Sequence, residues 1–283
     1  MTLTQADAAD AHPRDRRAMA RRAHLWLGLL LLAVCALSLE TGASGVSLVA
    51  LATGGAQADA LSSVILWEIR LPRVALGALV GAALAVSGAV MQGLFRNPLA
   101  DPGIVGVSAG AGLGAVAAIV LGGLLPPALQ GLIGIYTVPL AAFLGGWASV
   151  LMLYAVATRG GQTSVATMLL AGIALGALSG AVSGLLVYAA DDQQLRDLTF
   201  WGLGSLAGAT WAKVATAAPI IVAALIGASL LGRGLNGLAF GEATALHLGI
   251  PVQRVKRAAI LTVAAATGAA VAVSGGIGFV GIV

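Results

Sequence analysis

Long apolar runs alternate with short polar breaks along most of the chain. A bilayer core about 30 Å thick needs roughly 20 apolar residues in a helix that rises about 1.5 Å per residue. Seven stretches meet this requirement, at residues 25–42, 66–92, 103–123, 132–157, 165–190, 211–231 and 258–276. The pattern therefore predicts an all-α, polytopic membrane protein with about seven spans.

The composition agrees with this prediction. Hydrophobic residues make up 59% of the 283 residues and charged residues only 9%, whereas a soluble domain carries about a quarter charged residues. The 40 glycines lie mostly inside apolar runs, where small residues let helices pack closely. Cys35 is the only cysteine, so we expect no disulfide framework and no metal centre. A basic stripe with interleaved aromatic residues is missing, so nucleic acid is not an expected partner.

Basic residues divide unevenly between the two sides of the predicted bundle. With the N-terminus inside, 11 of the 15 Lys and Arg residues fall on the inner side, as the positive-inside rule requires. We therefore expect a cytoplasmic tail at 1–24, one membrane domain at 25–283 in the bacterial inner membrane, and a cytoplasmic loop at 233–257. The basic residues on the outer side are Arg70, Arg73, Arg196 and Lys213.

Residues 14–39 have a second interpretation. A basic start, a short apolar stretch and the sequence LAVC at 32–35 are also typical of a secretory signal peptide. The six spans downstream favour a first membrane helix that is retained.

Two segments of the chain repeat each other. Residues 81–88 read GAALAVSG and residues 268–275 read GAAVAVSG, and an arginine, Arg70 or Arg257, stands eleven residues before each copy. Five crossings separate the copies, so they enter the membrane from opposite faces. Inverted repeats of this kind are a transporter architecture.

Motifs for catalysis or for an energy source are not evident. The chain has no HExxH and no GxSxG, and its histidines, His12, His24 and His247, are scattered at terminal or loop positions. No glycine-rich P-loop with GK followed by Ser or Thr is present. Asp, Glu, Lys and Arg are absent between Asp101 and Arg159 and after Arg257, although ion-coupled transporters usually carry such residues in mid-membrane. We therefore expect a non-enzyme whose energy enters through another chain, rather than a secondary transporter, a passive channel or a scaffold.

The loop at 233–257 is long for a chain with otherwise short loops. Glu242 would begin a short helix, where the helix dipole favours an acid, and Gly249 would cap its end. Leu246 and Ile250 would lie on one face, and the basic cluster Arg254, Lys256 and Arg257 would hold the next helix to the cytoplasmic surface. The loop is either a docking element for a partner or an ordinary connection.

Glycine recurs every four residues at Gly172, Gly176, Gly180 and Gly184. This spacing places all four on one side of a helix. The bare stripe serves either helix packing alone or the wall of a translocation path.

Five segments together resemble the permease subunits of ABC importers for iron-siderophores, haem and vitamin B12. They are RLPR at 70–73, GAALAVSGAVMQGLFRNPLADPGIVGVSAGAG at 81–112, FWGLGSL at 200–206, GEATALHLGI at 241–250 and SGGIGFVGIV at 274–283. They extend from about residue 70 to the end, and their combination is far more specific than any one of them.

The resemblance implies a homodimer of permeases with about ten helices each, three of them beyond Val283. Its implied partners are two ATPase subunits, which bind the ATP and Mg²⁺, and a periplasmic binding protein, while this chain binds no cofactor. Arg70 and Arg73 would receive glutamates of the binding protein. The residues that would couple to the ATPase are Gly241, Glu242, Ala243, Leu246, His247 and Gly249. The glycines from Gly172 to Gly184 would line the path in an alternating-access mechanism.

Haem is the expected cargo, because the stretch at 194–208 resembles haem permeases more than vitamin B12 permeases. Arg196 beside Phe200 and Trp201 would suit a flat apolar ring with anionic propionates. A ferric siderophore or cobalamin is the alternative cargo. The aromatic residues could also form an interfacial belt, with Arg196 paired to Asp192 or Asp197.

Overall fold

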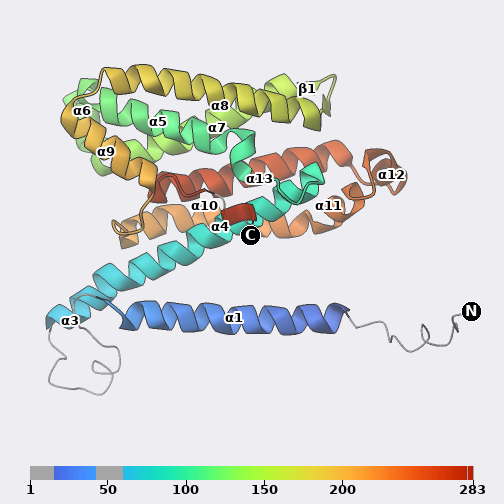
Figure 1. The fold of residues 1–283 in the computed structure, drawn as a ribbon, viewed down its shortest axis with the longest axis horizontal. Helices are drawn as coiled ribbons and strands as arrows, with labels where there is room; N and C mark the ends of the chain where they lie inside the picture. Colours follow the sequence, from blue (N-terminus) through green and yellow to red (C-terminus); the bar gives the residue numbers. More distant parts are fainter. Residues whose placement is uncertain (1–15, 43–59, 279, 283) are drawn as a thin grey trace, which may run out of the picture. The chain divides into compact units, whose positions relative to one another are not determined.

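The computed structural model describes residues 16–42, 60–278 and 280–282, and almost all of them are helical (Figure 1). The α-helices are α1 (Arg16–Glu40), α3 (Ala60–Val64), α4 (Leu71–Phe95), α5 (Val107–Leu121), α6 (Pro127–Ile133), α7 (Thr137–Ala157), α8 (Val165–Tyr188), α9 (Asp192–Leu203), α10 (Trp211–Leu230), α11 (Gly232–Leu238), α12 (Glu242–His247) and α13 (Val252–Ser274). The π-helix η1 (Ile65–Arg70) precedes α4, and short 3-10 helices are η2 (Pro102–Val105), η3 (Gly122–Leu124), η4 (Gly134–Tyr136) and η5 (Val280–Ile282). Two short strands, β1 (Thr158–Arg159) and β2 (Gln162–Thr163), form an antiparallel hairpin.

Seven helical segments within these residues are long and apolar enough to cross a membrane, and each overlaps one of the predicted stretches. The all-α, polytopic prediction is confirmed. Several helix ends differ from the expectation; the candidate spans Leu61–Phe95 and Pro127–Ala157, for example, begin before the predicted stretches at 66–92 and 132–157. The largest differences are at the starts of α1 and α13. Helix α1 already begins at Arg16, so residues 16–24 of the predicted tail are helical, and the rest of the predicted tail lies outside the described residues. Helix α13 begins at Val252, because its basic first turns belong to the helix.

The chain forms two compact units, Met1–Val74 and Ala75–Val283. In the first unit, η1 is a π-helix that ends just before Pro72. The N–H of Leu71 donates to the carbonyl of Leu66, five residues back. Proline lacks an N–H group and its ring crowds the carbonyl four residues earlier, so a wider turn accommodates it.

In the second unit, α13 is the most buried of the apolar segments. It packs against α5, α7 and α10, and small and branched residues such as Ala259, Ile260 and Val263 lie fully buried along it. Helices α5, α7 and α8 pack side by side above it in the view of Figure 1. Because lipid gives no hydrophobic drive for helix association, close van der Waals packing of this kind holds the bundle together.

Helices α4 and α13, which carry the repeated sequence, run in opposite directions (Figure 1). Near the end of α4, Gly93 packs beside Leu235 of α11. Near the start of α13, Val255 packs against Gly234, which is also in α11. At the other end, Gly77 of α4 lies beside Leu206, and the carbonyl of Ser274 in α13 accepts a hydrogen bond from the neighbouring Ser205. This antiparallel arrangement is the one that an inverted repeat requires.

Candidate functional site at the ends of the helix bundle

Helix α12 has the caps that its sequence predicts. Gly241 precedes it with φ of +100°, and Glu242 stands in its first turn. Gly249 follows it with φ of +77°, and across this left-handed residue the N–H of Ile250 donates to the carbonyl of Ala245 at 3.0 Å. This bond is typical of the Schellman motif, which ends many helices. The helix, its first-turn acid and its glycine cap are confirmed.

Large apolar side chains project from α12 and its flanks. Phe240 is 74% exposed, Leu246 61% and Leu248 64%. Ala243 and His247 are exposed as well. Ile250, in contrast, packs on Gly237 of α11. The expectation that Leu246 and Ile250 share a face is wrong, because the left-handed glycine between them reverses the chain.

The basic cluster at the start of α13 does not lie at the surface as a unit. Arg254 is exposed, but Lys256 is only 2% exposed and its Nζ lies 2.7 Å from Oε1 of Glu242. The Nε of Arg257 donates to the hydroxyl of Tyr154 at 3.2 Å, and its guanidinium lies 5.9 Å from the centre of that ring. Arg257 is nevertheless exposed, like Arg254, so Lys256 is the one member of the cluster that is buried.

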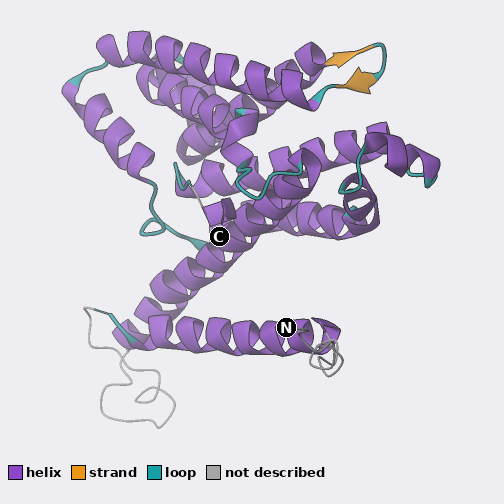
Figure 2. Ribbon diagram, turned by 45° about the vertical axis from the view of Figure 1, so that its right-hand side comes forward, coloured by secondary structure: helices purple, strands orange, loops and turns teal. Residues whose placement is uncertain are grey.

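Strands β1 and β2 form the hairpin that joins α7 to α8, drawn in orange in Figure 2. Lys256 contacts this hairpin. Its Nζ donates to the carbonyl of Thr163 at 2.7 Å. The N–H of the same threonine donates to Oε1 of Gln253 at 2.9 Å. The sequence reasoning missed this contact, since the partners are 93 residues apart. The available signal was a lysine in the second turn of a helix whose later residues are apolar.

The glycine stripe of α8 is uncovered over most of its length. Gly172 is buried near Gly106 at the start of α5. A methyl group added at Gly176, Gly180 or Gly184 would meet nothing within 4 Å among the described residues. The stripe therefore presents a smooth surface on which another helix or a passing ligand could lie.

Arg70 and Arg73, both in the first unit, differ in their surroundings. The guanidinium of Arg70 is 7% exposed and donates to the carbonyls of Leu39 and Glu40, the latter at 3.1 Å. These carbonyls belong to the last residues of α1, and carbonyls at the end of a helix need donors from outside the helix. Arg73, one turn later, is exposed.

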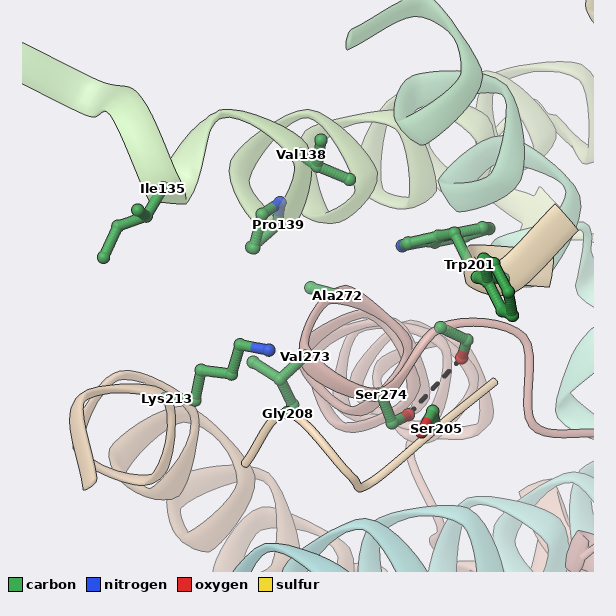
Figure 3. A pocket seen from close by; sticks show the side chains of 12 residues that line it. Ile135, Val138, Pro139, Trp201, Ser205, Gly208, Lys213, Ala272, Val273 and Ser274 are labelled. Atoms are coloured by element: carbon green, nitrogen blue, oxygen red, sulfur yellow. Dashed lines mark hydrogen bonds between the residues drawn. The ribbon is translucent and has the colours of Figure 1, made fainter. Parts of the chain in front are cut away.

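A cavity of about 360 Å³ lies between α7, α9, α10 and α13 (Figure 3). Its lining includes Phe200, Trp201, Lys213 and Ser274. The amino group of Lys213 extends toward α13, and Trp201 borders the opposite side (Figure 3). Arg196 is exposed on α9 and is not part of the lining. Phe200 and Trp201, which were predicted as ligand contacts, thus line the same cavity as Lys213. From the sequence, Lys213 was noted only as a basic residue on the outer side.

Charge differs between the two ends of the second unit. The end with α12 and the hairpin carries a basic surplus, and the end with α9 carries a mixture. The basic residues of the former are Arg96, Arg159, Arg233, Arg254, Lys256 and Arg257, and the charged residues of the latter are Asp191, Asp192, Arg196, Asp197 and Lys213. Among the residues that the structure describes, no group of three or more His, Cys, Asp or Glu side chains could hold a metal ion.

Seven apolar helices among the described residues, with an antiparallel repeat, define a multi-pass membrane protein. The sequence profile of the FecCD transport family matches residues 28–283, and the chain belongs to this family. The resemblance expected from the five segments is confirmed.

Relatives with named cargoes are similar over most of the chain. The hemin transport system permease HmuU of Yersinia pestis is 43% identical over 261 residues, which are 92% of this chain and 76% of the relative. The cobalamin import permease BtuC of Halobacterium salinarum is 44% identical over 225 residues, 78% of this chain and 58% of that protein. A metal-chelate type ABC transporter solved in an inward-facing conformation matches with a TM-score of 0.79 and 29% identity, over 93% of this chain and 79% of that one.

Proposed function

We propose that this chain is the membrane-spanning subunit of an ATP-driven importer that carries a metal chelate, with haem as the first candidate, from the periplasm to the cytoplasm. The observation that carries the proposal is α12, a capped helix with exposed Leu246 beside exposed Phe240 and Leu248. Large apolar side chains on a short polar loop are typical of a surface that a partner covers. A separate ATPase subunit is the partner that this surface would receive.

The orientation follows from charge. The basic end with α12 faces the cytoplasm under the positive-inside rule, and the end with α9 faces the periplasm. We also propose a cytoplasmic N-terminus, because 11 of the 15 Lys and Arg residues then fall on the inner side. The bacterial inner membrane is the proposed location, since the hemin permease relative comes from a bacterium. A second copy of the chain would pack against the uncovered glycine stripe of α8, so that the path runs along Gly176, Gly180 and Gly184. Alternating access then opens this path to one side at a time.

Docking of a periplasmic binding protein is the role we propose for the RLPR segment. Arg73 is exposed and can meet an acidic side chain directly. Arg70 holds the end of α1 through its bonds to Leu39 and Glu40, so it would position the segment as well as contribute charge. Complementary charges at such a surface mainly raise the rate of encounter and fix the register.

Haem is favoured as cargo by the cavity next to α9. Trp201 and Phe200 offer apolar faces to a flat ring, and Lys213 offers a cation to a propionate. The hemin permease relative supports the same choice, whereas the cobalamin permeases at 44% and 37% identity support the alternative cargo. Arg196 could guide the propionates from outside the cavity.

The test is ATPase activity of the permease co-purified with its candidate ATPase in lipid vesicles. Binding protein loaded with haem, with a ferric siderophore or with cobalamin is added from the outer side. Stimulation by one loaded protein supports the importer and identifies its cargo. If no ATPase co-purifies and no loaded protein stimulates hydrolysis, the proposal is rejected and a secondary transporter becomes the leading alternative.

A further inference from the structure

Lys256 joins three segments that are distant in the sequence. It lies in the second turn of α13 and is the bulkiest side chain among the fully buried ones of the described residues. Its ammonium group lies 2.7 Å from a carboxylate oxygen of Glu242 on α12 and 2.7 Å from the carbonyl oxygen of Thr163 on the hairpin. A buried ammonium without partners would be strongly unfavourable, so these two contacts fix its position.

Two hydrogen bonds connect Thr163 of the hairpin to α13. Thr163 accepts from Lys256 through its carbonyl and donates to Gln253 through its N–H. Both partners belong to the first two turns of α13. Ser164, the next residue, caps α8 by accepting from the N–H of Thr167. The start of α8 is therefore fixed to α13 by consecutive residues and cannot shift far unless these bonds break or α13 moves with it.

The other end of the junction is on the helix that we propose as the ATPase contact. Glu242 is 42% exposed and stands in the first turn of α12, so movement of α12 displaces its carboxylate directly. The hydrogen bond to Lys256 is charged at both ends and therefore stronger than a neutral one, and its lysine end is buried. One ammonium group thus binds both the first turn of α12 and Thr163, which lies two residues before the start of α8.

We infer that Lys256 is a positioning residue that transmits movement of α12 to the start of α8. This inference rests on the proposed function for its direction, from ATPase to translocation path. The contacts of Lys256 with Glu242 and Thr163 are observed in the structure and do not depend on which cargo is carried. The transmitted movement would alter the stripe of Gly176, Gly180 and Gly184 on α8, along which the path is proposed to run.

The first test measures cargo taken up per ATP hydrolysed in vesicles that contain the assembled importer. Lys256→Met keeps an unbranched side chain that is one atom shorter and removes its charge. We expect the uptake per ATP to fall by roughly five- to tenfold, in the range of coupling between distant sites. The ATPase should still co-purify, because Phe240, Leu246 and Leu248 are unchanged. Lys256→Arg should recover most of the coupling, and Arg254→Met, which removes an exposed cation from the same helix turn, should leave it unaltered.

A second measurement needs no cargo. Amide hydrogen exchange of the purified permease should show residues 158–168 exchanging about fivefold faster in Lys256→Met than in the parent or in Arg254→Met, because local opening becomes easier when an anchor is lost. If Lys256→Met does not fold, Glu242→Gln replaces it, since this change is at a partly exposed site and removes the ion pair alone.

The outcomes separate the inference from the proposed function. If the parent protein shows no stimulated ATPase, the proposed function fails, and the exchange measurement alone decides whether Lys256 anchors the hairpin. If the parent is coupled and both Lys256→Met and Glu242→Gln keep the parental uptake per ATP, the inference is overturned. Unchanged exchange of residues 158–168 in Lys256→Met overturns it as well.

Discussion

Gly110 of α5 and Gly145 of α7 face each other so closely that a methyl group on either one would overlap the backbone of the other. Gly114 stands in the same position against the carbonyl of Ala141, one turn along. Beside them, the buried hydroxyl of Ser149 donates to the carbonyl of Gly106 at 2.9 Å. Glycine is required along this contact because only a hydrogen side chain leaves room for two helix backbones to meet.

Gly145→Ala should therefore destabilise the permease by about 1–3 kcal/mol, the usual range for overpacking. The matched control is Gly28→Ala on α1, where an added methyl group meets nothing within 4 Å among the described residues. Alanine is the better helix former there by about 1 kcal/mol. Thermal unfolding in detergent should show a lower midpoint for Gly145→Ala and no loss for Gly28→Ala. Equal midpoints for the two variants would contradict the packing argument.

Leu246→Asp should weaken association with the ATPase by roughly 30-fold. The basis is a loss of about 2 kcal/mol, as for a central contact residue. Leu203→Asp on α9 is the control, since Leu203 is 72% exposed on a short helix at the opposite end of the second unit. Co-purification with the ATPase measures the effect. Retention of the ATPase by Leu246→Asp would show that α12 is not the docking surface.

Arg73→Glu should reduce stimulation by loaded binding protein about tenfold at low salt, because a like charge then meets the proposed acidic partner. The defect should shrink as salt is added, since exposed charges are screened. Arg254→Glu, an exposed charge reversal at the α12 end, serves as control and should leave binding-protein affinity unchanged. The affinity is measured by titration of binding protein onto vesicles, and a salt-independent defect would exclude an electrostatic role for Arg73.

Lys213→Gln should lower haem uptake about tenfold, because it removes the cation that is proposed to donate to a propionate. Arg196→Gln should have a smaller effect, since Arg196 lies outside that lining. Uptake of radiolabelled haem into vesicles measures both variants. If Arg196→Gln lowers haem uptake more than Lys213→Gln does, the propionates bind at α9 rather than in the cavity. If neither change lowers uptake, haem recognition does not use these cations.

The membrane spans were predictable because they depend on local composition. A run of about 20 apolar residues specifies a spanning helix wherever it occurs, and all seven predicted stretches overlap helices of that length. The capped helix α12 was also predictable, since Gly241, Glu242 and Gly249 act on their immediate neighbours. The chain reversal that separates Leu246 from Ile250 was not predictable from the sequence. The direction of the chain after the left-handed Gly249 depends on where Ile250 packs, which is against Gly237.

The sequence by itself determined the fold class, the repeat, the family and the capped helix, because each of these depends on residues close together in the chain or on a matched motif. Only the tertiary structure decided which charges are buried. Lys256 and Arg254 are two residues apart in α13, yet Lys256 is 2% exposed and Arg254 is exposed. The difference arises because Glu242 and the carbonyl of Thr163 converge on one side of α13, and a charge can be buried only where such partners meet it.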